Sequence, residues 1–204
     1  SERGVDVAGD PDVVSIAVQL GGVPLALELA AGRLGVLSPA DVLEHLGLSL
    51  LRCSTRGLPL RQTTLRGALD WSWELLAASE QSALAQLSVF RGGFDLDDAA
   101  MTIDLAGADV LDAVQALQDH SLLVHRFGRL DLLGTVQAYA AERLLERGES
   151  RAIRLAHARW FSRHGAPANM RARSGPARTR LDQAIARDFG NLKVAVDNAT
   201  DEGE

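Results

Sequence analysis

Apolar residues recur every three or four positions along most of the chain, which is the spacing of amphipathic helices. In the first fifty residues, turn residues interrupt this spacing three times, at Asp10-Pro11, at Gly21-Gly22-Val23-Pro24 and at Ser38-Pro39. Each interruption ends in proline, which is favoured at the first helical position because an N–H there would be unpaired anyway. We therefore predict three helices with tight joints in residues 1–52, a helical domain too small to be stable alone.

Residues 53–63 (CSTRGLPLRQT) show no periodicity and are predicted to be a connector. Helical spacing returns from Leu65, and a later turn, Arg91-Gly92-Gly93, precedes a helix with an Asp95–Asp98 capping pair. After the helix DVLDAVQALQDH the period changes, because two short apolar runs flank Phe127-Gly128, which predicts a β-hairpin. A further helix follows. Helices, hairpin and helix in this order indicate a winged-helix domain over residues 64–148.

The last part of the chain, residues 149–204, contains two helical segments separated by the Gly-, Pro- and Arg-rich stretch RARSGPAR. They are predicted to be the first helices of a tetratricopeptide-like array. The expected fold class is mainly α: a small helical domain, a winged-helix domain with a short β-hairpin, and the start of a helical repeat region.

Composition narrows the environment of the protein. The chain has 204 residues and a formal net charge of −6. It contains no run of eighteen apolar residues and no secretory signal, so we expect no membrane contact and a cytoplasmic location. Cys53 is the single cysteine, which excludes an internal disulfide framework and a cysteine-based zinc site. Because the sequence begins without methionine, we interpret it as a fragment of a longer chain.

A winged helix raises the possibility of DNA binding through the helix before the hairpin, which would enter the major groove. That helix carries Asp109, Asp112 and Asp119 but no lysine or arginine, and carboxylates oppose binding to phosphates. The hairpin adds only Arg126 and Arg129, a weak DNA-binding signal. Residues 151–187 contain nine arginines, a pattern that more often marks a solvated helix face. We expect the winged helix to contact protein.

The sequence offers no catalytic residue and no metal ligand set. A nucleotide-hydrolysing protein needs a G-x-x-x-x-G-K-[ST] loop, and Lys193, the one lysine of the chain, lies in GNLKVAV. A G-x-S-x-G nucleophile elbow is missing as well. The five histidines are scattered. His157 and His164 could share a helix face, but neither has a nearby cysteine or carboxylate partner. We therefore expect no enzymatic activity from this chain alone.

Five segments, in fixed order and spacing, carry a family resemblance: GGVPLALELAAGRL, RQTTLRGALDWSWELL, EQSALAQLSVFRGGFDLDDA, ALQDHSLLV and LDLLGTVQAYAAERLLERGE. Together they resemble the C-terminal half of the nucleotide-switch region (NB-ARC or STAND class) of bacterial signal-transduction ATPases. The similarity is strongest to the large regulators of the antibiotic-regulatory-protein and LuxR types. It extends from about residue 10 to residue 198.

The resemblance implies that Gly22, Val23, Pro24 and Leu25 lie on the adenine side of a bound ADP or ATP. A glycine there permits close backbone approach, and a proline ring offers a flat face that loses no rotamer entropy. From the residues alone, a plain helix start explains the same turn equally well. ATP or ADP would bind only in the full-length protein, whose P-loop domain and helical-repeat sensor are the implied partners.

Two positions depart from the family pattern. Leu132, Leu133 and Gly134 align with a second nucleotide-sensing motif, in which Leu133 and Gly134 are the candidate sensor residues. Gly134 stands where relatives carry an acid. Ala77 occupies a helix start where relatives usually have Ser-Pro, and it supplies no side-chain cap.

The expected function is that of a non-catalytic part of an ATP- or ADP-dependent regulator in transcriptional control. It would form the lid and winged helix of the nucleotide switch and relay the switch state to helical repeats. DNA contact would then belong more to other domains. The alternatives are a DNA-binding winged-helix transcription factor and a protein-interaction scaffold without a nucleotide role.

Overall fold

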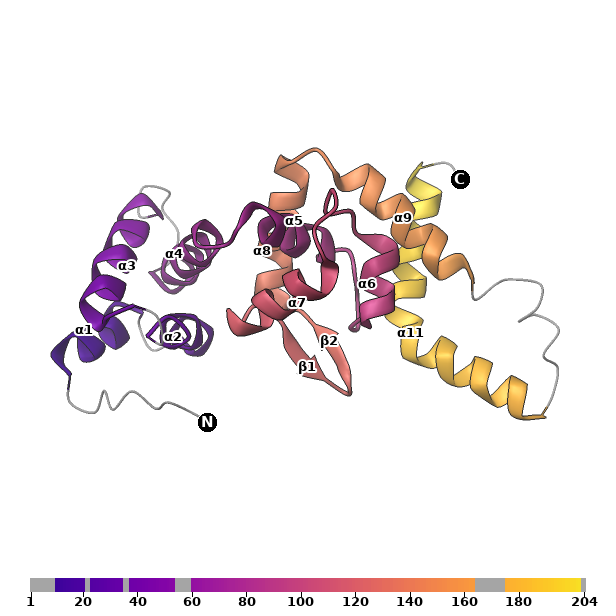
Figure 1. Ribbon diagram of the computed structural model, residues 1–204, viewed down its shortest axis with the longest axis horizontal. Helices are drawn as coiled ribbons and strands as arrows, with labels where there is room; N and C mark the ends of the chain where they lie inside the picture. The colour runs from indigo at the N-terminus through magenta and orange to yellow at the C-terminus, as the bar shows by residue number, and fades with distance from the viewer. Residues whose placement is uncertain (1–9, 21–22, 35–36, 54–59, 164–174, 203–204) are drawn as a thin grey trace. The chain divides into compact units, whose positions relative to one another are not determined.

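The computed structural model describes residues 10–20, 23–34, 37–53, 60–163 and 175–202 (Figure 1). The described chain is mainly helical with one two-stranded antiparallel sheet, which confirms the fold class expected from the sequence. Its contacts divide it into two units. Unit 1 comprises residues up to Ala77 together with Leu117–Leu122, and unit 2 comprises Ala78–Ala116 and Leu123–Glu204.

In the described residues, unit 1 has four helices, and the first three begin at prolines that the sequence marks as helix starts. They are α1 (Pro11–Gln19), α2 (Pro24–Ala31), α3 (Pro39–Cys53) and α4 (Leu60–Glu74). The Asp10 side chain accepts a hydrogen bond from the Asp12 N–H at 2.8 Å. At the start of α3, the Asp41 N–H donates to Ser38 Oγ and the Ser38 N–H donates to Asp41 Oδ2, both at 3.2 Å. This is a capping box, which satisfies N–H groups that a helix start leaves unpaired.

Helix α1 packs on α3, and α4 packs on both α2 and α3. The apolar face of α4, which includes Ala68, Leu69 and Trp71, is buried. This burial groups α4 with unit 1, whereas the sequence pattern assigned its residues from 64 onward to the winged-helix domain. The predicted connector is shorter in the structure, since α3 reaches Cys53 and α4 begins at Leu60; residues 54–59 lie outside the described residues.

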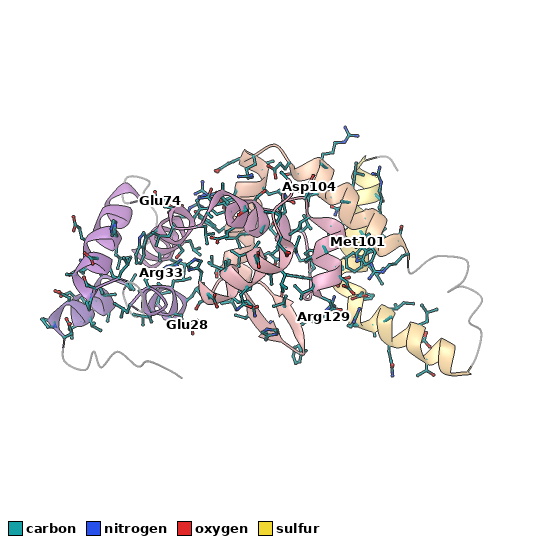
Figure 2. All side chains as sticks on the ribbon, viewed as in Figure 1. Glu28, Arg33, Glu74, Met101, Asp104 and Arg129 are labelled. Atoms are coloured by element: carbon teal, nitrogen blue, oxygen red, sulfur yellow. The ribbon has the colours of Figure 1, made fainter. Side chains whose placement is uncertain are left out.

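The segment Leu117–Leu122 joins unit 1 through a polar contact as well as apolar ones. The buried Arg33 side chain, labelled in Figure 2, donates a hydrogen bond to Nδ1 of His120. Leu117 and Leu122 are themselves buried.

The described part of unit 2 contains six helices and the hairpin. They are α5 (Ala78–Leu87), α6 (Leu96–Thr102), α7 (Val110–Asp119, whose end belongs to unit 1), β1 (Val124–Arg126), β2 (Arg129–Asp131), α8 (Gly134–Glu146), α9 (Ser150–Ser162) and α11 (Gly175–Glu202). The order of helices, hairpin and helix is the winged-helix order that the sequence predicts. Helix α11 packs on α9, α6 packs on α9, and α5 packs on α8.

The hairpin turn has the geometry that matches the right-handed twist of its strands. Val124 pairs with Asp131, and Arg126 pairs with Arg129. Both turn residues have positive φ, 52° at Phe127 and 75° at Gly128, as a type I′ turn requires. Phe94 adds a short bridge to Leu130 through two backbone hydrogen bonds of 2.8 and 3.0 Å. The hairpin is thereby fixed to the turn before α6.

None of the helices in the described ranges has both the length and the apolarity needed to cross a lipid bilayer.

Candidate functional site: a buried polar network in unit 2

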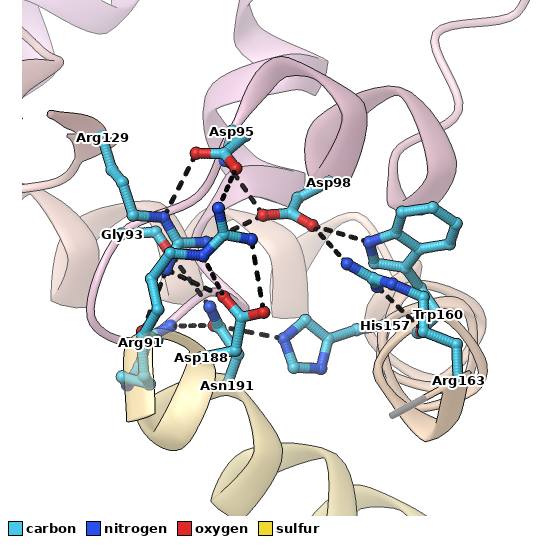
Figure 3. A network of polar contacts seen from close by, with 11 residues as sticks. Arg91, Gly93, Asp95, Asp98, Arg129, His157, Trp160, Arg163, Asp188 and Asn191 are labelled. Carbon is cyan, nitrogen blue, oxygen red and sulfur yellow. Dashed lines mark hydrogen bonds and ion pairs between the residues drawn. The ribbon is translucent and has the colours of Figure 1, made fainter. Parts of the chain in front are cut away.

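Arg129 lies in a polar network beside the turn of the hairpin (Figure 3). It is the first residue of β2, and its side chain is 7% exposed. Its guanidinium forms ion pairs with Asp98 at 2.8 Å, with Asp188 at 3.0 Å and with Asp95 at 3.3 Å. These carboxylates come from the start of α6 and from the middle of α11. One side chain thus connects the hairpin to two helices that are distant in sequence.

The start of α6 places two of these carboxylates. The Asp95 N–H donates to Asp98 Oδ2 at 3.0 Å, which is half of the predicted capping box. Before it, Gly93 has a φ of +84°, and a Cβ at this position would lie 3.0 Å from the Leu130 carbonyl oxygen. Glycine is therefore required here both by the backbone angle and by the close approach of the turn to β2.

Asp98 also connects α6 to α9. Its second oxygen, Oδ1, accepts hydrogen bonds from Trp160 Nε1 at 2.8 Å and from Arg163 Nη2 at 3.0 Å. Burial raises the pKa of the Asp98 carboxyl, but the bonds from Trp160, the Asp95 N–H and Arg163 and the charge of Arg129 outweigh it, so this pKa lies below its usual value. The carboxylate therefore stays ionised at neutral pH although it is almost completely buried.

Helix α11 is held against the turn before α6 by Asn191. The amide oxygen of Asn191 accepts from the Arg91 N–H at 2.6 Å, and its Nδ2 donates to the Gly93 carbonyl at 2.8 Å. A Cβ at Gly190 would lie only 2.5 Å from the Arg91 carbonyl oxygen. Glycine at position 190 therefore allows the backbone of α11 to come into direct contact with this turn.

His157 forms the inner end of the network. It is fully buried, its Nε2 lies 3.4 Å from Asn191 Oδ1, and its ring packs against Phe90 and Phe161. Burial lowers the pKa of His157 to about 4, and the contact with Asn191 offsets only part of this effect. The imidazole is therefore neutral at pH 7 and serves as a packed polar group.

The network is balanced in charge. Arg187, on the exposed side, forms ion pairs with Asp95 at 3.0 Å and with Asp188 at 3.4 Å. Three arginines, 129, 163 and 187, therefore face three aspartates, 95, 98 and 188. Every named group already has protein partners. Such an arrangement holds elements in one register, because any shift would leave a buried charge unpaired.

In the part of the chain that the structure describes, no group of three or more histidine, cysteine, aspartate or glutamate residues is arranged to hold a metal ion.

The residues assigned to adenine lie in unit 1, at the start of α2. Gly22 lies outside the described residues. Val23 precedes the helix in extended conformation and is half-buried, Pro24 is the first helical residue and is exposed, and Leu25 is half-buried. An exposed ring at this position is accessible to a ligand.

The second predicted sensor position lies in unit 2, at the start of α8. Leu133 precedes the helix and is half-buried. Gly134 is the first residue of the helix and is exposed, and a Cβ there would meet open space. The packing around position 134 therefore does not require glycine, and a larger side chain would fit there.

The two weak DNA-binding candidates differ in their surroundings. Arg126 is exposed at the end of β1, beside the ring of Phe127. Arg129 is buried and neutralised by carboxylates, so a phosphate would have to displace Asp98 and Asp188 to reach it. Sequence reasoning identified Asp98 only as a helix cap. It missed Asp188, Asn191 and His157, because nothing in their spacing indicates which distant residues they meet.

No known protein-family profile matches the chain, and no solved structure matches it either. Curated relatives exist. A protein of Mycobacterium tuberculosis (strain H37Rv) named "Putative HTH-type transcriptional regulator" is 36% identical over 197 residues, which cover 90% of this chain and 21% of that protein. A protein of the same name from Mycobacterium bovis shows the same identity and coverage.

A second M. tuberculosis relative, named only as an uncharacterized protein, is 39% identical over 151 residues, covering 69% of this chain and 38% of the relative. The chain therefore spans between a fifth and two fifths of the length of these curated relatives. The similarities to proteins named as HTH-type regulators indicate a transcription-regulator family.

Proposed function

We propose that the chain is the lid and winged-helix part of a nucleotide-dependent switch in a multidomain transcription regulator. In this proposal, unit 1 contributes Pro24 to the adenine side of bound ADP or ATP, and unit 2 passes the nucleotide state to following helical repeats. The P-loop that would hold the phosphates belongs to another part of the full-length protein. The chain itself is not an enzyme, and the switch operates in the cytoplasm.

The single observation that carries the relay is the Arg129 network. Arg129 ties the hairpin to α6 and α11, and Asp98 extends the same cluster to α9. A displacement of the winged-helix elements therefore carries α9 and α11 with it, because separating them would leave ionised groups buried and unpaired. This is the rigid coupling that hinge-type switching needs between a moving domain and its output.

The nucleotide part of the proposal is supported by the geometry of the α2 start and by the order of the family motifs. Pro24 is exposed at the first helical position, and the half-buried Val23 and Leu25 flank it. A pyrrolidine ring between two apolar residues is a suitable face for stacking of a purine base. Because the ring is rigid, the proline side chain loses almost no conformational entropy when the base binds.

Calorimetric titration of the full-length protein with ADP tests the nucleotide role. We expect Pro24→Asp to weaken ADP binding at least tenfold, since an exposed carboxylate replaces the stacking face. Pro11→Asp is the matched control: Pro11 is also exposed and also the first residue of its helix, but it lies at α1. Equal ADP affinities for wild type and Pro24→Asp would refute the assignment.

The second candidate function is direct DNA binding by unit 2. It is favoured by the names of the relatives, which are HTH-type transcriptional regulators, and by the exposed His125 and Arg126 on the hairpin. Fluorescence anisotropy of the protein with a mixed-sequence DNA duplex separates the two functions. Our proposal expects weak binding that vanishes near physiological salt, because Asp109 and Asp112 are exposed at the start of α7. Tight binding that survives such salt and is lost in Arg126→Ala would favour the DNA reader.

A further inference from the structure

Unit 2 contains a groove of about 490 Å³ that the Arg129 network does not use. It is formed by residues that follow the end of α5 and by residues of α8, α9 and α11. Its volume lies within the range of small-molecule sites in proteins, about 300–1,000 Å³. It also lies where the winged-helix elements meet the C-terminal helices, since α8 belongs to the former and α11 to the latter.

The residues that line the groove include three aliphatic side chains and two side chains with a buried polar atom that has no partner. Val89, Leu144 and Val194 supply aliphatic surface. Within the described part of the chain, Asn198 Nδ2 and Ser88 Oγ are buried and make no hydrogen bond. An unpaired buried polar group costs about 1–3 kcal/mol. A bound molecule with a carbonyl oxygen would offset this cost once the Asn198 amide turns toward it.

Two opposite charges at the groove also lack ion pairs in the described ranges. Arg154 of α9 and Asp197 of α11 both line the groove and are exposed. By contrast, Arg129, Arg143 and Arg147 of the same unit pair with acids. Of the remaining charged groups of the groove, Arg91 donates through Nη1 to the Ser88 and Phe90 carbonyls, and Glu142 also has a partner.

We propose that this groove binds a small zwitterion with an apolar body, of the size of a dipeptide. Its carboxylate would face Arg154, its ammonium group would face Asp197, its internal carbonyl would accept from Asn198, and its side chains would lie on Val89, Leu144 and Val194. A ligand in this position touches α8 and α11 at once. Its binding therefore stabilises one arrangement of the winged-helix elements and the C-terminal helices. The site does not depend on a nucleotide role for unit 1.

Three probes test the proposal by calorimetry and by backbone-amide NMR of the protein. L-leucyl-L-leucine carries both charges, its N-acetyl derivative keeps only the carboxylate, and its C-terminal amide keeps only the ammonium group. We expect the zwitterion to bind at least tenfold more tightly than either derivative, with shift changes confined to residues of the groove. Absence of saturable shift changes in these residues at 10 mM zwitterion, a concentration well above that of a ~1 mM complex, would overturn the proposal.

Single variants identify which group serves which charge. Arg154→Gln should lower the affinity for the zwitterion and the N-acetyl derivative about tenfold and leave the amide derivative unchanged. Asp197→Asn should do the reverse. Asn198→Leu should weaken all three probes, because they share the peptide carbonyl. Arg151→Gln is the matched control, one turn earlier on the same helix and outside the groove. Equal effects of Arg151→Gln and Arg154→Gln would contradict the assignment.

The same titration on the full-length protein distinguishes a ligand site from a surface that the rest of the protein covers. Binding of the zwitterion to both forms supports the proposal. Binding to the 204-residue chain alone would overturn it, because the groove would then be occupied by another segment of the full-length protein. Neither result depends on ADP. A failure of the zwitterion to bind therefore does not affect the nucleotide proposal, which the ADP titration tests separately.

Discussion

Unit 1 and unit 2 are both mostly helical, yet different interactions hold them together. The buried residues of unit 1 are mainly aliphatic, with Trp71 beside them, and its buried charge in the described ranges is Arg33. Unit 2 also buries aliphatic and aromatic side chains, but it adds Asp98, Arg129 and Asp188 in one connected cluster. Apolar packing tolerates small slips between helices, whereas buried charges do not.

This difference matches the roles that we propose for the two units. A lid over a nucleotide has to open and close, and packing that is mainly aliphatic allows its helices to adjust at modest cost. A relay has to keep its parts in one register, and a charge network makes every other register expensive. Unit 2 should consequently depend on pH and on single polar groups much more strongly than unit 1.

The largest expected effect is that of removing Arg129. Arg129→Met leaves Asp98 and Asp188 buried without their central partner, and breaking such a pair costs about 3–5 kcal/mol. Urea unfolding followed by circular dichroism measures the total loss, and hydrogen exchange with mass spectrometry assigns it to unit 2. Arg126→Met, on the exposed end of the other strand, is the control and should change the free energy of unfolding by less than about 0.5 kcal/mol. A loss of under 1 kcal/mol in Arg129→Met would show that the network does not hold unit 2 together.

The next effect is a loss of stability in mild acid, through His157. The pKa of His157 is about 4 in the folded protein, against a usual 6.5, so the unfolded chain binds the proton more tightly. The stabilisation is complete above pH 6.5 and is lost as the pH falls toward 4, by up to about 3 kcal/mol. Protonation of Asp98, whose pKa is lowered, adds a further loss at still lower pH, below its usual titration range.

Thermal unfolding between pH 7 and pH 4 measures this dependence. His157→Gln should be less stable at pH 7, because the packing with Phe90 and Phe161 is disturbed, but its stability should fall less between pH 6.5 and 4. His125→Gln changes an exposed histidine and should retain the wild-type slope. The same slope in His157→Gln as in wild type would assign the acid sensitivity to other groups.

A smaller effect concerns two glycines that the structure treats differently. Gly190→Ala brings a Cβ to 2.5 Å from the Arg91 carbonyl oxygen, so α11 must shift and the Asn191 hydrogen bonds lengthen. We expect a loss of about 1–3 kcal/mol. Gly134→Ala meets open space and restricts the unfolded chain, so it should gain about 0.5 kcal/mol. Chemical unfolding of both variants checks the opposite signs; a gain in Gly190→Ala would contradict the close approach of α11.

The sequence predicted local structure well, since its signals are themselves local. The Ser38–Asp41 capping box, the start of α2 at Pro24 and the hairpin around Phe127-Gly128 all lie where their spacing indicates. The network could not be predicted in the same way. Arg129 and Asp188 are separated by fifty-eight intervening residues, and only the packed fold shows that both are buried and in contact. An arginine beside a turn therefore looked like an exposed wing residue.

The assignment of α4 to unit 1 could not be predicted from the sequence for a related reason. The apolar face of α4 has the spacing of any amphipathic helix, so the pattern gives its period but not its partner. Burial of Ala68, Leu69 and Trp71 places this helix with α2 and α3. The boundary between the two units then falls at Ala77, the position at which the sequence departs from the family pattern.

The smallest predicted effect lies at this boundary and sharpens the comparison of the two units. Ala77 is exposed and directly precedes α5, so its methyl group cannot accept a hydrogen bond from the first turn. Ala77→Ser supplies a cap and should stabilise α5 by about 1 kcal/mol. Ala78→Ser is the matched control inside the helix, where serine caps nothing and slightly lowers helix propensity.

Hydrogen exchange shows which amides share the gain of Ala77→Ser. If the two units unfold independently, protection should increase by about fivefold in Ala78–Ala116 and remain unchanged in α1 to α3, since about 1 kcal/mol corresponds to such a factor. Equal slowing in α1 to α3 would mean that both units unfold as one cooperative body. A rigid relay and an adjustable lid could not then be separate properties of the two units, and the proposed division of roles between them would be wrong.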